Sequence, residues 1–182
     1  KNFQFKTFAS HSPLHAALRL TKSTRRARDG FFLRAESYFN VATNIEDLDR
    51  EPGFGPKIIE SFGGRPLHEQ SHGEAFLALL ENRLRGKGLY IFDEPEAALS
   101  PTRQMSMLVR MHDLIAEDSQ FIIATHSPIL MAYPDACIYV CSNDGLTKVA
   151  YEETEHFRIT RAFLMNPERM LKTLLDPATD DE

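Results

Sequence analysis

The sequence predicts an α/β fold with a mainly parallel sheet, because short apolar runs alternate with longer stretches of helical periodicity. The apolar runs predict five strands, at 31–35, 88–93, 120–124, 136–141 and 146–150. The last two flank Ser142-Asn143-Asp144-Gly145, in which the Asp-Gly pair favours a tight turn. We therefore expect a C-terminal antiparallel hairpin that adds an edge to the sheet.

Helix starts are marked by Ser or Asn followed by Pro, a combination of a good N-cap with the residue favoured in the first helical position. Such pairs occur at Ser12-Pro13, Ser100-Pro101, Ser127-Pro128 and Asn166-Pro167. Helices are expected at 12–22, 36–49, 71–85, 101–117, 127–132, 154–165 and 167–175. The stretch 50–70 is rich in Gly and Pro, so we expect a loop there with a short helix near 57–61.

The length of 182 residues fits a single domain, and the net charge of −5 excludes a strongly basic nucleic-acid binder. The charge leaves room for a local basic patch, but the run from Lys22 to Arg28 is better interpreted as a solvated helix end. No apolar run approaches the length of a membrane span and no signal peptide is visible, so the cytoplasm is the expected location. Cys137 and Cys141 lie four apart on a predicted strand and are expected to be core residues, not a disulfide.

Two carboxylates follow the apolar run Leu89-Tyr90-Ile91-Phe92, where a buried strand should end. Open α/β sheets bind their ligands at the carboxyl ends of the strands. A hydrated Mg²⁺ on nucleotide phosphates uses one or two carboxylates, so Asp93 is the candidate metal residue. Glu94 is the candidate general base that would polarise the attacking water. A plain acidic helix start after a buried strand is the structural alternative.

Two further segments carry candidate residues. His126 follows the apolar run at 121–124 and could donate a hydrogen bond to a terminal phosphate, although a surface-loop histidine is the commoner case. Ser71 and Glu74 form the S-x-x-E pattern of a capping box, which is a complete structural account by itself. Ser71, Gly73 and the helix start could also offer donors to a phosphate.

The order of these segments resembles the ATP-binding-cassette class of P-loop ATPases, whose signature loop, Walker B motif, D-loop and switch His occur in that order. The corresponding residues are Gln70-Ser71-His72-Gly73-Glu74, Leu89 to Glu94, Ala97-Ala98-Leu99-Ser100 and His126. Ser71-His72-Gly73-Glu74 and the run from Asp93 to Gln104 look like a group of small, stand-alone bacterial ATPases described as predicted AAA-type ATP-binding proteins. By the same resemblance, Glu36 occupies the place where the class carries its Q-loop Gln.

Two features depart from the class. His72 stands where transporter cassettes usually carry Gly. The Walker A pattern G-x-x-x-x-G-K-[ST] does not occur in the 182 residues. We therefore expect residues 1–182 to form a single, partial cassette-type domain that lacks the N-terminal Walker A strand and helix. The fragment alone is expected to bind ATP poorly and to be inactive.

The resemblance implies that the intact protein binds ATP and Mg²⁺ and hydrolyses ATP. Asp93 would serve the metal, Glu94 the water, and His126 the γ-phosphate. Ser71, Gly73 and Glu74 would reach the ATP of a second subunit in an ATP-dependent homodimer. A DNA repair or chromosome-maintenance ATPase, a transporter ATPase subunit and a non-catalytic interaction module are the alternatives. Nothing in the sequence supports a nucleic-acid partner directly.

Overall fold

A computed structural model of the chain describes residues 14–17, 19–21, 24, 26–35, 45, 48–50, 57–65 and 71–175. Its helices and strands run in the order α1 (Leu14–Ala17), β1 (Asp29–Arg34), η2 (Ile58–Phe62), α3 (His72–Asn82), β2 (Gly88–Asp93), η4 (Pro95–Ala98), α4 (Pro101–Ala116), β3 (Gln120–Ala124), α5 (Pro128–Met131), β4 (Ile138–Ser142), β5 (Gly145–Val149), η5 (Tyr151–Glu153), α6 (Glu155–Met165) and α7 (Pro167–Leu175), where η denotes a 3₁₀ helix. The expected helices at 12–22 and 36–49 and the cap at Ser12 lie largely outside the described residues.

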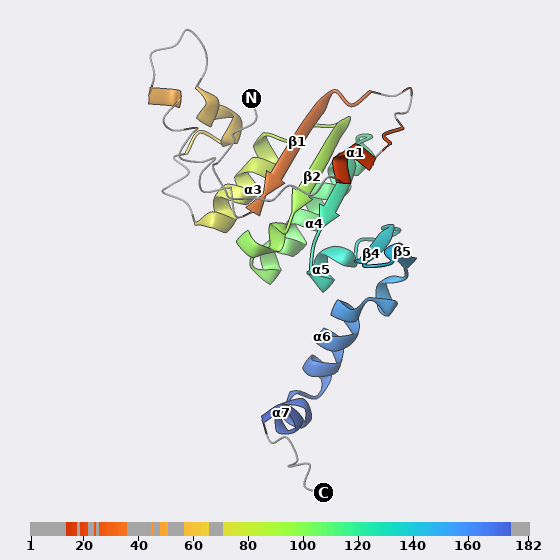
Figure 1. The fold of residues 1–182 in the computed structure, drawn as a ribbon. Helices are drawn as coiled ribbons and strands as arrows, with labels where there is room; N and C mark the ends of the chain where they lie inside the picture. Colours follow the sequence, from red (N-terminus) through yellow and green to blue (C-terminus); the bar gives the residue numbers. More distant parts are fainter. Residues whose placement is uncertain are drawn as a thin grey trace, which may run out of the picture.

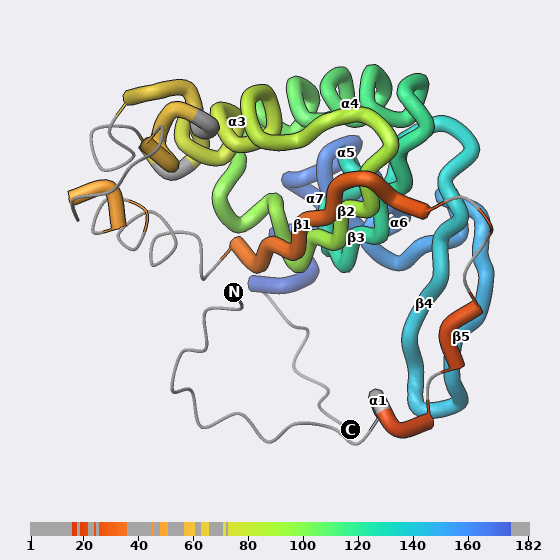
Figure 2. Tube along the Cα trace, turned by 90° about the horizontal axis from the view of Figure 1, so that it is seen from above, coloured from red at the N-terminus to blue at the C-terminus, as the bar shows by residue number. Residues whose placement is uncertain are grey.

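The main sheet is parallel and has the order β1-β2-β3 (Figure 1). Helices α3 and α4 lie together along one side of it, as Figure 2 shows. The central strand β2 ends at Asp93, which is in register with Arg34 on one neighbour and Ala124 on the other. The predicted parallel α/β arrangement is therefore confirmed, and it brings three strand ends to one edge.

The core forms between this sheet and the two covering helices. Alternate residues of β2 point to opposite faces, and Tyr90 and Phe92 are fully buried on the helical side. Phe92 packs against Phe76 of α3 in an edge-on arrangement with ring centroids 6.2 Å apart. The other residues fully buried in this layer are Leu79, Leu80, Leu84, Met107 and Leu114. This core holds the end of β2 firmly in place.

The C-terminal hairpin forms as predicted but does not extend the main sheet. Strands β4 and β5 pair only with each other, in a separate two-stranded antiparallel sheet. The expectation of an added sheet edge was therefore wrong. Cys137 and Cys141 are exposed free thiols, so their expected place in the core was wrong as well. The reason is the same for both: among the described residues no second layer covers this hairpin, and most of its side chains are exposed.

Beyond the hairpin, helices α6 and α7 extend away from the sheet (Figure 1). The first turn of α6 lies close to the carboxyl edge of the sheet, where His156 contacts His126, and α6 also contacts α5. Tyr151 donates a hydrogen bond from its hydroxyl to the Pro128 carbonyl oxygen over 2.9 Å. Among the described helices, none is both long enough and apolar enough to span a membrane.

Candidate active site

Asp93 lies at the end of β2 and forms an ion pair across the sheet. Its Oδ2 atom accepts a hydrogen bond from Arg34 Nε over 2.6 Å. Arg34 stands at the matching position of β1, so the strand register itself sets the pair. The Asp93 carboxylate is therefore compensated by a cation at a strand end, and any metal ion bound there would compete with the guanidinium.

Glu94 has a left-handed backbone, with φ 50° and ψ 51°. Residues with a side chain rarely adopt this conformation, and it persists only where the surroundings enforce it. Two features enforce it here: the Glu94 N–H donates to the Ala124 carbonyl oxygen over 2.9 Å, and the following Pro95 is buried. The sharp turn leaves the Glu94 carboxylate exposed at the carboxyl edge of the sheet, 3.6 Å from Nε2 of His126.

Glu96 fixes the loop that carries His126. One carboxylate oxygen accepts from the Thr125 hydroxyl over 2.7 Å, and the other accepts from the His126 backbone N–H over 2.5 Å. Hydrogen bonds to a charged acceptor are stronger than neutral ones. Glu96 thus ties the turn after β2 to the turn after β3, and it sets the position of the His126 backbone.

The His126 ring lies between two partners. Nε2 faces the Glu94 carboxylate at 3.6 Å, and Nδ1 lies 2.9 Å from Nε2 of His156, on the first turn of α6. The structure therefore brings together Asp93, Glu94 and His126, as the sequence led us to expect, at the edge where the three parallel strands end.

Ser71, Gly73 and Glu74 form a second group at the start of α3. Ser71 and Glu74 make the predicted capping box, and Ser71 Oγ also accepts from Arg103 Nη1 over 2.9 Å. The hydrogen bonds from Ser71 hold the pKa of Glu74 below its ordinary value. Gly73 leaves room for this arrangement: a Cβ there would lie 2.3 Å from Arg103 Nη1 and 3.1 Å from the Ala98 carbonyl oxygen.

No described contact joins the Ser71 group to the Glu94–His126 pair. The chain between them does connect them, since η4 and the start of α4 supply Ala98 and Arg103 to the first group and Glu96 to the second. Glu36 lies outside the described residues, so its predicted role stays a prediction.

The donor set at the strand ends suits Mg²⁺ only in the mode that uses one or two carboxylates together with substrate oxygens and water. Among the described residues, no group of three or more His, Cys, Asp or Glu side chains is placed to hold a metal ion by itself. Asp93 and Glu94 supply the carboxylates that this mode of binding requires, provided that the ion pair between Arg34 and Asp93 opens. The residues therefore fit a metal delivered with phosphates and not a closed protein site.

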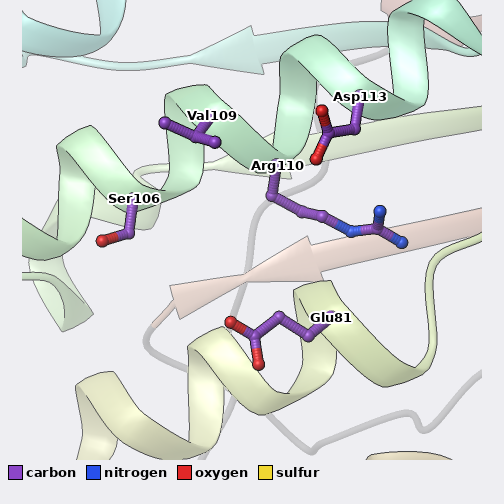
Figure 3. Close-up of a pocket in the computed structure, with 5 residues that line it drawn as sticks. All are labelled: Glu81, Ser106, Val109, Arg110 and Asp113. Carbon is purple, nitrogen blue, oxygen red and sulfur yellow. The ribbon is translucent and has the colours of Figure 1, made fainter.

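A hollow elsewhere on the molecule contains none of these residues. It lies between α3 and α4 and is lined by Glu81, Ser106, Val109, Arg110 and Asp113 (Figure 3). Arg110 donates to the carbonyl oxygens of Leu80 and Leu84, so its guanidinium serves the C-terminal end of α3. This hollow is accounted for by helix packing and helix termination.

Sequence reasoning assigned no role to Arg34, Glu96, Arg103 or His156. Glu96 had the clearest signal, because a third acidic residue within Asp93-Glu94-Pro95-Glu96 needs a partner of its own. Arg34 could have been found from the expected alignment of neighbouring parallel strand ends. Arg103 and His156 had no local signal, because their partners lie 32 and 30 residues away.

Residues 63–132 match the family described as "AAA domain, putative AbiEii toxin, Type IV TA system". This stretch contains Ser71, Gly73, Glu74, Asp93, Glu94 and His126. The chain is also 26% identical over 155 residues to the chromosome partition protein Smc of Methanococcus voltae. That alignment covers 72% of this chain but only 13% of the Smc sequence. No solved structure matches the chain significantly.

The family match covers the central part of the chain, from the start of α3 to the end of α5, which includes β2 and β3.

Proposed function

We propose that the intact protein binds Mg²⁺·ATP at the carboxyl edge of the sheet and hydrolyses it. The observation that carries this proposal is the approach of Glu94 to His126 at 3.6 Å, directly beside Asp93. A carboxylate base, an imidazole donor and a metal-compatible carboxylate are among the side chains that serve phosphoryl transfer to water, and the Walker A residues that would cradle the phosphates do not occur in the 182 residues. The match of residues 63–132 to an AAA domain family supports the same assignment.

In this mechanism, Glu94 accepts a proton from the water whose oxygen attacks the γ-phosphorus. The bond from that phosphorus to the β–γ bridging oxygen breaks, and ADP leaves. His126 Nε2–H donates a hydrogen bond to the terminal phosphate. Asp93 would hold the metal ion with its carboxylate, which must first separate from the Arg34 guanidinium. Mg²⁺ supplies charge neutralisation for the phosphate oxygens when it is bound.

The test is Glu94→Gln in the full-length protein. The amide keeps the shape of the carboxylate but cannot take a proton, so hydrolysis should fall by roughly 10²–10⁴-fold. ATP binding should persist, as measured by calorimetry. Glu168→Gln on α7 is the matched control, because it removes an exposed carboxylate far from the strand ends along the chain. Turnover of the Glu94 variant within twofold of wild type would remove Glu94 from the base role.

The finer proposal is that the protein belongs to the cassette class and forms an ATP-dependent homodimer. Ser71, Gly73 and Glu74 would then face the ATP of the second subunit, since they make no described contact with Glu94 or His126 of their own chain. Glu94→Gln should keep ATP bound without hydrolysing it, and bound ATP should hold the two subunits together. Light scattering of this variant with ATP should therefore give the mass of a dimer. A monomer at saturating ATP would contradict this proposal without touching the role of Glu94.

Chromosome maintenance is a second candidate, favoured by the similarity to Smc. It predicts that DNA stimulates the ATPase, whereas a DNA-independent ATPase would not respond. A titration of the full-length protein with duplex DNA, with ATP hydrolysis as the readout, separates the two candidates. The salt concentration is kept low and constant, because the phosphate-driven part of DNA binding weakens steeply as salt rises.

A further inference from the structure

His156 lies against His126, the candidate switch histidine. It belongs to α6, a helix that supplies none of the candidate catalytic residues. It is the second residue of α6, it is half-buried, and its Nε2 lies 2.9 Å from Nδ1 of His126. The two rings are tilted by 39° with centroids 5.0 Å apart. The geometry is that of a ring-to-ring hydrogen bond and not of stacking alone.

The position of His156 is fixed from two sides. Thr154, which is buried, accepts from the Phe157 N–H and so caps the first turn of α6. Tyr151, in the η5 turn that leads into α6, donates to the Pro128 carbonyl oxygen and so joins η5 to α5. The rings of Tyr151 and Phe157 also pack with centroids 4.6 Å apart. Since α5 begins two residues after His126, the same short region positions both histidines.

The two contacts of His126 together define where its proton lies. A hydrogen bond between two ring nitrogens needs one donor and one acceptor. On the other side of the ring, Nε2 faces the negatively charged Glu94 carboxylate, which favours an N–H at Nε2. In a neutral His126, Nδ1 is then the bare acceptor, and His156 must be the donor.

We propose that His156 is a positioning residue that holds neutral His126 in the tautomer with its proton on Nε2. That nitrogen faces Glu94 and, if the proposed function is correct, the terminal phosphate. Its N–H is the only kind of group on the ring that can donate to a phosphate oxygen. Without a donor at position 156, Nδ1 can take the proton instead, and the ring loses a fixed orientation.

The test begins with nitrogen NMR of the chain labelled at histidine, at a pH of about 8.5, where ordinary histidines are neutral. The His126 signals are assigned from their loss in His126→Gln. In the wild type, Nδ1 of His126 should have the shift of a bare acceptor nitrogen. In His156→Phe, which fills the ring volume without a donor, that signal should move toward the average of bare and protonated nitrogen. In His156→Gln, whose amide can donate, it should return toward the wild-type position.

His112→Phe is the matched control, because His112 contacts Tyr133 on another part of the chain. It should leave the His126 signals unchanged. A protonated Nδ1 in wild-type His126, or an unaltered signal in His156→Phe, would overturn the proposal. This readout needs no ATP, so it stands or fails separately from the proposed function.

If the full-length protein hydrolyses ATP, kcat of His156→Phe should fall roughly 10- to 100-fold with little change in KM, because orientation and not binding is lost. His156→Gln should recover most of this loss. An unchanged kcat in His156→Phe would overturn the link to catalysis, while an inactive wild type would overturn the proposed function alone.

Discussion

At the scale of single residues, the carboxyl edge of the sheet is organised by side chains that connect neighbouring strand ends. Arg34 compensates Asp93 across β1 and β2, and Glu96 binds the turn that follows β3. The left-handed backbone of Glu94 is maintained between them by the Ala124 carbonyl oxygen. The three acidic residues within Asp93-Glu94-Pro95-Glu96 thus have three different environments. Under the proposed function, this one short segment would supply a metal residue, a base and a structural anchor.

Glu96 offers a direct test of this division of roles. Glu96→Ala removes both acceptors from the turn at Thr125 and His126, so the free energy of unfolding should fall by about 1–3 kcal/mol. Glu96→Gln keeps one acceptor oxygen and should lose less. Urea unfolding of the chain measures both. Equal unfolding midpoints for Glu96→Ala and the wild type would show that the turn is held by other contacts.

At the scale of helices and strands, the features predicted correctly are the helix caps and strand ends, which depend on residues close together in the sequence. The caps at Ser71, Ser100, Ser127 and Asn166 are all present, because an N-cap and its helix lie within one turn of each other. The strands 88–93 and 120–124 were also predicted correctly, because their ends have clear polar boundaries. The contacts that complete the candidate site, such as His126 with His156, join residues about 30 positions apart, and no local pattern encodes them.

The hairpin illustrates the same limit. Its turn and strand pairing follow from a short local motif, and both were predicted correctly. The strand next to the hairpin does not follow from that motif, because joining the main sheet would require pairing with β3 or β1, and neither strand is part of the motif. The exposure of Cys137 and Cys141 could therefore not be deduced from their spacing.

A network at the opposite end of the sheet joins β1 to the end of α3. Asp29 accepts from Arg83 Nη1 over 2.9 and 3.0 Å and from the Tyr90 hydroxyl over 3.1 Å. Partial burial raises the pKa of Asp29, but the hydrogen bonds and the charge of Arg83 outweigh it, so the pKa is lowered from 3.8. The charged carboxylate is therefore the form that stabilises the fold.

Asp29→Asn should cost about 1–2 kcal/mol of unfolding free energy at neutral pH, because a charged acceptor is lost. A lowered folded-state pKa means that the contribution of Asp29 is fully present above its unfolded pKa and is lost as the pH falls through the folded value. The wild type and the variant should thus differ by a constant amount above about pH 5 and converge below about pH 4. Urea midpoints measured across this range check the prediction. A difference that grows as the pH falls would contradict it.

At the scale of the whole molecule, the two faces of the parallel sheet differ sharply among the described residues. Helices α3 and α4 cover the face of Tyr90 and Phe92 (Figure 2). On the other face, Phe32 and Ile122 are 64% and 51% exposed, and they flank Ile91 in register across the three strands. Parallel sheets in α/β proteins are usually covered on both faces, so this row is unusual for its fold class.

Ile122 and Ile123 are adjacent in β3 and point to opposite faces, which makes them a matched pair for this asymmetry. Ile123→Thr places a hydroxyl among core residues and removes methylene contacts, so it should cost roughly 1–3 kcal/mol of unfolding free energy. Ile122→Thr changes an exposed position to another β-branched residue and should cost less than about 0.5 kcal/mol. Urea unfolding of the two variants under identical conditions gives the comparison. Equal losses would mean that the Phe32–Ile91–Ile122 face is buried in solution, since only burial makes the exchange of the ethyl branch for a hydroxyl at position 122 as costly as at position 123.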